Sequence, residues 1–116
     1  MKRKVMIVDD VADIRVMLRY ILEKEDYTIV AEAANGVEAV EKYREHLPDI
    51  TIMDIDMPYM TGVEAAQEIR EMASDARIIF CSAGNSKYEE ILRGIPAKTI
   101  IKKPFMPAQL YQAMAM

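Results

Sequence analysis

Short apolar runs recur along the chain, separated by longer segments in which apolar residues return every three or four positions. The runs are continuous rather than alternating, which is typical of strands buried on both faces of a parallel sheet. The pattern predicts five strands, at Val5–Val8, Thr28–Ala31, Ile50–Met53, Ile78–Cys81 and Thr99–Ile101.

The segments between the runs have the spacing of amphipathic helices. It is clearest after the first run, where one helix face would carry Ile14, Met17, Leu18, Ile21 and Leu22. Weaker forms of the pattern cover Val37–Tyr43, Val63–Met72, Tyr88–Ile95 and the segment from Pro107 onward. Because strand and helix alternate, we expect a doubly wound α/β domain, in which helices cover both faces of a five-stranded parallel sheet.

Chemically useful side chains follow the predicted strands. Asp9 and Asp10 follow the first strand, Asp54 the third, Ser82 the fourth and Lys103 the fifth. In doubly wound sheets, functional groups collect at the carboxyl ends of the strands. We therefore expect three carboxylates, a hydroxyl and an ammonium group to meet at one edge of the sheet.

These groups together suit phosphoryl transfer. Three neighbouring carboxylates repel one another, so one of them is protonated or a cation binds between them. Oxygen ligands favour Mg²⁺, whereas the chain has no cluster of cysteine and histidine that would suit zinc. A cation, a lysine and a hydroxyl can hold the oxygens of a phosphoryl group, and an aspartate can be the nucleophile.

Composition narrows the class of protein. The 116 residues, 52% of them hydrophobic, fit a single domain spanning residues 1–116. A formal net charge of −4 argues against direct binding to nucleic acid. Cys81 is the sole cysteine, which excludes an intramolecular disulfide and fits a cytoplasmic protein. No apolar stretch has the length of a membrane span, and the N-terminus lacks the core of a signal peptide.

Several motifs, in order and correctly spaced, resemble a known family. They are the Asp9-Asp10 pair, Asp54 with Met57-Pro58 after it, Gly62, Ser82-Ala83 and Lys103-Pro104-Phe105. Together they resemble the bacterial response-regulator receiver domain of two-component systems, over essentially the whole chain. The similarity is greatest to stand-alone chemotaxis regulators (CheY-like). It implies a flavodoxin-like sheet of strand order 2-1-3-4-5 and no output domain.

The resemblance also implies roles for the site residues. Asp54 would accept the phosphoryl group, while Asp10 and Asp54 ligate Mg²⁺ directly and Asp9 acts through water. The backbone carbonyl of Asp56 would complete the protein ligands, with its side chain as a further candidate, and Mn²⁺ is an alternative ion. Lys103 would pair with the phosphoryl oxygens, Ser82 would hydrogen-bond to them, and the Lys103–Pro104 peptide bond would be cis.

Partners are implied in the same way. The donor would be a sensor histidine kinase, a histidine phosphotransfer protein or a small acyl phosphate, and phosphorylation would change the affinity for a downstream protein. The protein would catalyse only its own phosphorylation and dephosphorylation. The docking face of the kinase would be bordered by Asp13, Ile14, Arg15 and Leu18. Ile100 departs from the family, because receivers often carry an aromatic switch residue there.

Other interpretations stay open at this level. Taken singly, Asp9 and Asp10 could cap the next helix, and the remaining site residues could be ordinary loop residues. The Asp54-Ile55-Asp56 segment also matches the paired aspartates of haloacid-dehalogenase-like phosphatases, although that family carries the pair at its first strand. The chain could be a receiver fragment of a longer regulator. A flavodoxin-like nucleotide binder is disfavoured, because two carboxylates at the first loop would repel a phosphate.

Overall fold

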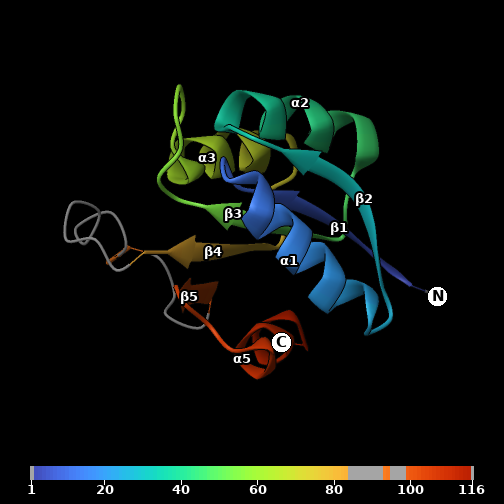
Figure 1. Ribbon diagram of the computed structural model, residues 1–116. Helices are drawn as coiled ribbons and strands as arrows, with labels where there is room; N and C mark the ends of the chain where they lie inside the picture. Colours follow the sequence, from blue (N-terminus) through green and yellow to red (C-terminus); the bar gives the residue numbers. More distant parts are fainter. Residues whose placement is uncertain (1, 84–92, 95–98, 116) are drawn as a thin grey trace.

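Strands and helices alternate over residues 3–82, and a further strand and helix follow within residues 100–115 (Figure 1). The computed structural model describes residues 2–83, 93–94 and 99–115. The elements of the first half are β1 (Arg3–Val8), α1 (Ala12–Glu23), β2 (Tyr27–Ala33), α2 (Gly36–His46) and β3 (Ile50–Asp54). Those of the second half are α3 (Gly62–Met72), β4 (Ile78–Ser82), β5 (Ile100–Lys102) and α5 (Pro107–Ala115).

The five strands form one parallel sheet in the order β2-β1-β3-β4-β5. This confirms the expected strand order. Two of the interior strands, β3 and β4, are buried over their whole lengths. Burial on both faces explains why their sequences are nearly unbroken apolar runs rather than alternating ones.

Helices cover both faces of the sheet, as predicted. α2 and α3 lie on one side and α1 and α5 on the other (Figure 1). Successive residues of β1 point to opposite faces, so Met6 and Val8 join the core under α2 and α3, whereas Val5 and Ile7 join the core under α1 and α5. None of the helices in the described part of the chain combines the length and apolar character needed to cross a membrane.

The observed elements contain most of the predicted ones. The first four strands include every predicted strand residue, while β5 begins at Ile100, one residue later than expected. The helix predicted at Tyr88–Ile95 lies largely outside the described residues. The N-cap of α1 is Val11, which makes no side-chain capping bond, so the interpretation of Asp9 and Asp10 as N-caps is wrong.

Strand register brings the predicted site residues to one edge. Val8 pairs with Met53, so Asp9 follows β1 beside the end of β3. Asp54 pairs with Cys81, and Ser82 pairs with Lys102. The residues that end or follow these four strands therefore lie next to one another, although they are far apart in sequence.

Candidate functional site

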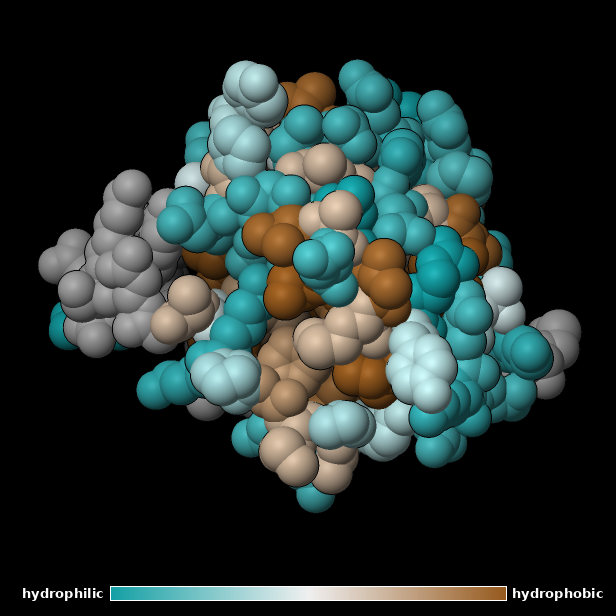
Figure 2. All heavy atoms as spheres, viewed as in Figure 1, coloured by the Kyte–Doolittle hydropathy of each residue, from teal (hydrophilic) through white to brown (hydrophobic). Residues whose placement is uncertain are grey.

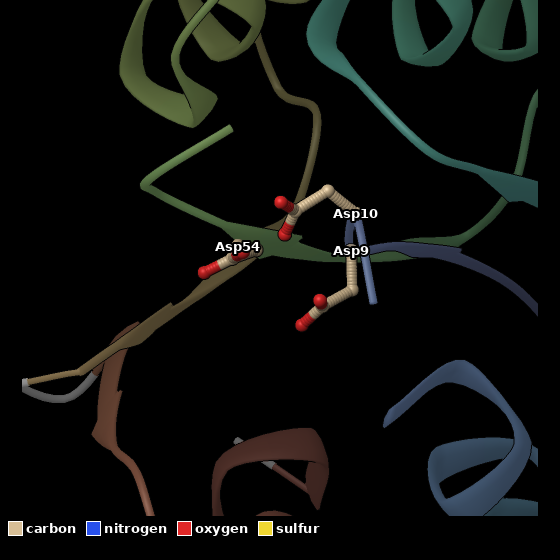
Figure 3. A group of neighbouring side chains, drawn as sticks. All are labelled: Asp9, Asp10 and Asp54. Carbon is tan, nitrogen blue, oxygen red and sulfur yellow. The ribbon is translucent and has the colours of Figure 1, made fainter. Parts of the chain in front are cut away.

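Three carboxylates gather where β1 and β3 end (Figure 3). One oxygen from each of Asp9, Asp10 and Asp54 lies within 4.8 Å of the others. Asp9 and Asp54 are buried, with 1% and 6% of their surfaces exposed, whereas Asp10 is exposed. The site is thus closed on the side of the sheet and open to solvent at Asp10.

Lys103 joins two of these carboxylates from the end of β5. Its Nζ lies 2.7 Å from Oδ2 of Asp9 and 3.3 Å from Oδ1 of Asp54. The other carboxylate oxygen of Asp9 accepts a hydrogen bond of 2.9 Å from the backbone N–H of Val11. Asp9 is therefore held by a cation and by the main chain that leads into α1.

Negative charge is in excess at the site. The pKa of Asp54 is raised to about 6, mainly by burial and then by the charge of Asp9, although Lys103 acts in the opposite direction. Burial lowers the pKa of Lys103, but its hydrogen bond to Asp9 and the nearby carboxylates outweigh this and leave the pKa raised. A carboxylate whose ionisation is opposed in this way is suited to bind a further cation. The oxygen ligands and the open side at Asp10 fit Mg²⁺, which retains several waters.

Ser82 ends β4 next to this group. It is buried, and its backbone carbonyl accepts a hydrogen bond of 2.6 Å from the N–H of Lys103. The peptide bond from Lys103 to Pro104 is cis, in agreement with the expectation. Burial raises the pKa of the neighbouring Cys81 thiol to about 12, which disfavours the reactive thiolate near neutral pH.

Asp56 lies apart from the three gathered carboxylates. Its side chain is exposed and does not belong to the group formed by Asp9, Asp10 and Asp54. A role for its backbone carbonyl as a metal ligand stays a prediction.

Two glycines allow the loop after β3 to pack closely. A Cβ atom on Gly62 would lie 2.0 Å from the carbonyl oxygen of Asp54, and one on Gly36 would lie 2.7 Å from the backbone oxygen of Met60. Gly62 belongs to the motifs of the family resemblance, whereas the sequence pattern gave no sign of a role for Gly36. Its role depends on a contact between α2 and a distant loop, which no local pattern reveals.

The face expected to dock the kinase needs one correction. Leu18 is 1% exposed and packs in the core beneath α1, so it does not contribute to a docking surface. Asp13 is exposed, and Ile14 and Arg15 are partly exposed. The large apolar side chains that α1 does expose are Val16, Met17 and Tyr20.

Comparison with known proteins identifies the same family. The family profile described as "Response regulator receiver domain" matches residues 5–115. The chain is 44% identical to the chemotaxis protein CheY of Bacillus subtilis and 46% identical to that of Thermotoga maritima, in each case over 98% of this chain and 96% of the relative. A chain in the crystal structure of the CheX–CheY–BeF3–Mg²⁺ complex from Borrelia burgdorferi is similar to this chain, with a TM-score of 0.86 at 36% identity. That match covers 97% of this chain and 86% of the other.

Proposed function

This chain belongs to the response-regulator receiver family, and from that premise we propose that it is a phosphorylation switch whose acceptor is Asp54. The observation that carries the proposal is the convergence of Asp54 with Asp9, Asp10 and Lys103 at one sheet edge. The family is that of CheY-like two-component regulators. A role in chemotaxis or a phosphorelay is accordingly part of the proposal.

The acidic group would hold Mg²⁺, with Asp10 and Asp54 as direct ligands, Asp9 acting through water and the carbonyl of Asp56 as a further ligand. Mn²⁺ would fit the same oxygen ligands. The bound cation would supply positive charge for the oxygens of the transferred phosphoryl group. The likeness to a complex that contains CheY and Mg²⁺ supports this proposal.

Each protein group has a task in the transfer. A carboxylate oxygen of Asp54 attacks the phosphorus, a new O–P bond forms, and the bond from phosphorus to the donor breaks. The ammonium of Lys103 already lies 3.3 Å from Oδ1 of Asp54. During the transfer it gives up part of this contact and binds the phosphoryl oxygens instead. The hydroxyl of Ser82 donates a hydrogen bond to the same oxygens.

The donor would be a histidine kinase or a phosphotransfer protein that docks on α1. Apolar residues of this helix lie on the face shown in Figure 2. Beside it is a pocket of about 290 Å³. The pocket is lined by Ile14, Met17, Ala83, Lys103, Pro104 and Phe105. Since Lys103 also contacts Asp54, a protein seated here would reach the acceptor while covering exposed apolar surface.

The output would be a changed affinity for a downstream protein, and the chain would act in the cytoplasm without binding nucleic acid. The net charge of −4 supports the last point. The phosphatase alternative is not favoured, because the family match covers nearly the whole chain and Asp56 stands outside the carboxylate group. The chain would therefore catalyse only its own phosphorylation and dephosphorylation.

The test is the intact mass of the protein after incubation with acetyl phosphate, with Mg²⁺ or with EDTA. We expect one phosphoryl adduct that requires the cation and is absent from Asp54→Asn. Asp13→Asn is the matched control, because Asp13 is an exposed aspartate on α1 outside the carboxylate group. An adduct that persists in Asp54→Asn, or that never forms on folded wild-type protein, would contradict the proposal.

A further inference from the structure

Arg15 links the surface of the molecule to the backbone of the acidic site. From the first turns of α1, its Nη1 donates a hydrogen bond of 2.6 Å to the carbonyl oxygen of Asp9. Its Nε lies 3.3 Å from Oε1 of Glu32. Glu32 belongs to β2 and pairs in register with Ile7 of β1, two residues before Asp9. The guanidinium therefore bridges Glu32 of β2 and the backbone carbonyl of Asp9, the residue that directly follows β1.

We propose that Arg15, held in place by Glu32, is a positioning residue that fixes the Asp9-Asp10 segment for cation binding. This inference rests on the proposed function, since it assumes that these two aspartates hold the cation. It assigns to Arg15 a role inside the protein, in addition to the surface role that the family resemblance implied.

The peptide unit between Asp9 and Asp10 connects the contact of Arg15 to the position of Asp10. This unit is planar, so the direction of the Asp9 carbonyl also sets the direction of the N–Cα bond of Asp10, to which the Asp10 side chain is attached. The N–H of Asp9 is bound to the carbonyl of Ala33 at 3.1 Å, and its carbonyl is bound to Arg15. Asp10 is exposed, so its placement depends on this backbone more than on packing around its side chain.

Glu32 is itself well anchored, which makes it a suitable support. Its carboxylate also pairs with Arg19, and its backbone carbonyl accepts a hydrogen bond from Lys42 of α2. Contacts from α1 and α2 therefore converge on one residue of β2. A guanidinium can bridge Glu32 and the Asp9 carbonyl because its donors point in several fixed directions, whereas a single ammonium cannot replace that geometry.

Charge and positioning predict opposite results for Arg15. As a positive charge near a cation site, Arg15 would weaken binding of Mg²⁺, and its loss would strengthen binding. As a positioning residue, it would strengthen binding, and its loss would weaken it. Arg15→Lys removes the bridge and keeps the charge, so a weaker affinity in this variant reports on positioning.

The experiment is calorimetric titration of metal-free protein with Mg²⁺, in wild type, Arg15→Lys, Glu32→Gln and the double variant. We expect Arg15→Lys to lose about tenfold in affinity, as groups that orient metal ligands commonly do, and Glu32→Gln to lose about threefold. The double variant should lose less than the product of the two, because both changes break one bridge. Glu23→Gln is the matched control: Glu23 pairs with Arg19 of the same cluster, and its variant should bind as wild type does.

A second readout uses the metal-free protein and separates positioning from general stability. The N–H of Val11 is bound to the Asp9 carboxylate, so its hydrogen exchange should be faster in Arg15→Lys than in wild type, while amides in the middle of β3 keep their protection. If wild type binds no Mg²⁺, the proposed function fails. If wild type binds Mg²⁺ and Arg15→Lys and Glu32→Gln bind it equally well, the proposed function stands and this inference is overturned.

Discussion

Single residues at the site are governed by an imbalance of charge. Asp9, Asp10 and Asp54 lie together, and Lys103 contacts only two of them within the described part of the chain. Burial removes water that would stabilise the ionised carboxylate of Asp54, and the charge of Asp9 adds repulsion, so the pKa of Asp54 is raised to about 6. The ionised form of Asp54 that the proposed function requires is therefore the form that burial destabilises.

The first prediction concerns the stability of Asp54→Asn. A carboxyl whose pKa is raised by folding destabilises the native state once it ionises, so the wild type should lose stability relative to the variant as pH rises from about 4 through about 6. Without divalent cations at pH 7.5, the variant should be more stable by about 1 to 2 kcal/mol, less than the full shift implies because the site is open to solvent on one side. Urea unfolding in EDTA across this pH range checks the prediction, and a constant difference between the two proteins would contradict it.

The second prediction concerns Lys103→Met. Removing the ammonium removes a charge that repels the cation, so the dissociation constant for Mg²⁺ should fall. Phosphorylation by acetyl phosphate should slow by more than about tenfold, because a charge aimed at the developing phosphoryl charge is lost. Calorimetry and the rate of adduct formation check the two parts. Lys102→Met, the same change at an exposed neighbouring residue, should alter neither quantity.

Helix ends show how individual elements are stabilised. Asn35 caps α2 by accepting from the N–H of Glu38, and Thr61 and Glu64 form a capping box at α3. α5 has no basic residue in its last turn. Its last carbonyls instead accept hydrogen bonds from arginine side chains of other segments. Arg77 donates to the carbonyl of Ala113 at 2.7 Å, and Arg3 donates to that of Met114 at 3.5 Å. The end of α5 is therefore fixed by the residue before β4 and by the first residue of β1.

The third prediction tests this arrangement with Arg77→Gln. Arg77 is partly buried. Burial and the charge of Arg3 lower its pKa, which means that the protonated guanidinium is less favourable here than in water. Loss of its bond to the helix end should nevertheless lower the free energy of unfolding by about 1 kcal/mol. Urea unfolding measures this, with Arg70→Gln on the exposed face of α3 as the control of equal charge change. Equal stability of the two variants would count against the capping role.

For the molecule as a whole, the parallel sheet is what assembles the site. Its strands end at a common edge, and the register places the ends of β1, β3 and β4 beside the start of the segment that carries Lys103. Binding of a cation at this edge would connect the residues that follow β1 with the end of β3, which are far apart in the sequence. Such binding should therefore stabilise the whole fold rather than one element.

The fourth prediction follows from this linkage. At a Mg²⁺ concentration of 100 times the dissociation constant, the folded state should gain about 2.7 kcal/mol, and the melting temperature should rise by several degrees. Circular dichroism melts in Mg²⁺ and in EDTA measure the gain. Asp10→Asn should lose most of it and Asp13→Asn should keep it. A gain of equal size in Asp10→Asn would show that the cation stabilises the protein elsewhere.

Much of the fold was predictable because it follows from local patterns. Continuous apolar runs indicated the strands at Ile50–Met53 and Ile78–Cys81, which β3 and β4 contain, and helical spacing indicated α1. The order of polar residues after the strands also indicated that Asp9, Asp54 and Lys103 would meet, since parallel strands end at one edge. The strand order required more than these patterns, and came from the resemblance of the motifs to a known family.

Contacts between distant segments were decided only by the tertiary structure. Helical spacing places Leu18 and Arg15 close together on α1, but packing buries Leu18 in the core, while Arg15 reaches the Asp9 carbonyl and Glu32. The close approach of Gly36 to Met60 likewise depends on how α2 meets the loop after β3. The sequence by itself determined which elements form and which side chains reach the sheet edge, because these follow from periodicity and chain order. The supports of those side chains depend on distances across the fold, which periodicity does not encode.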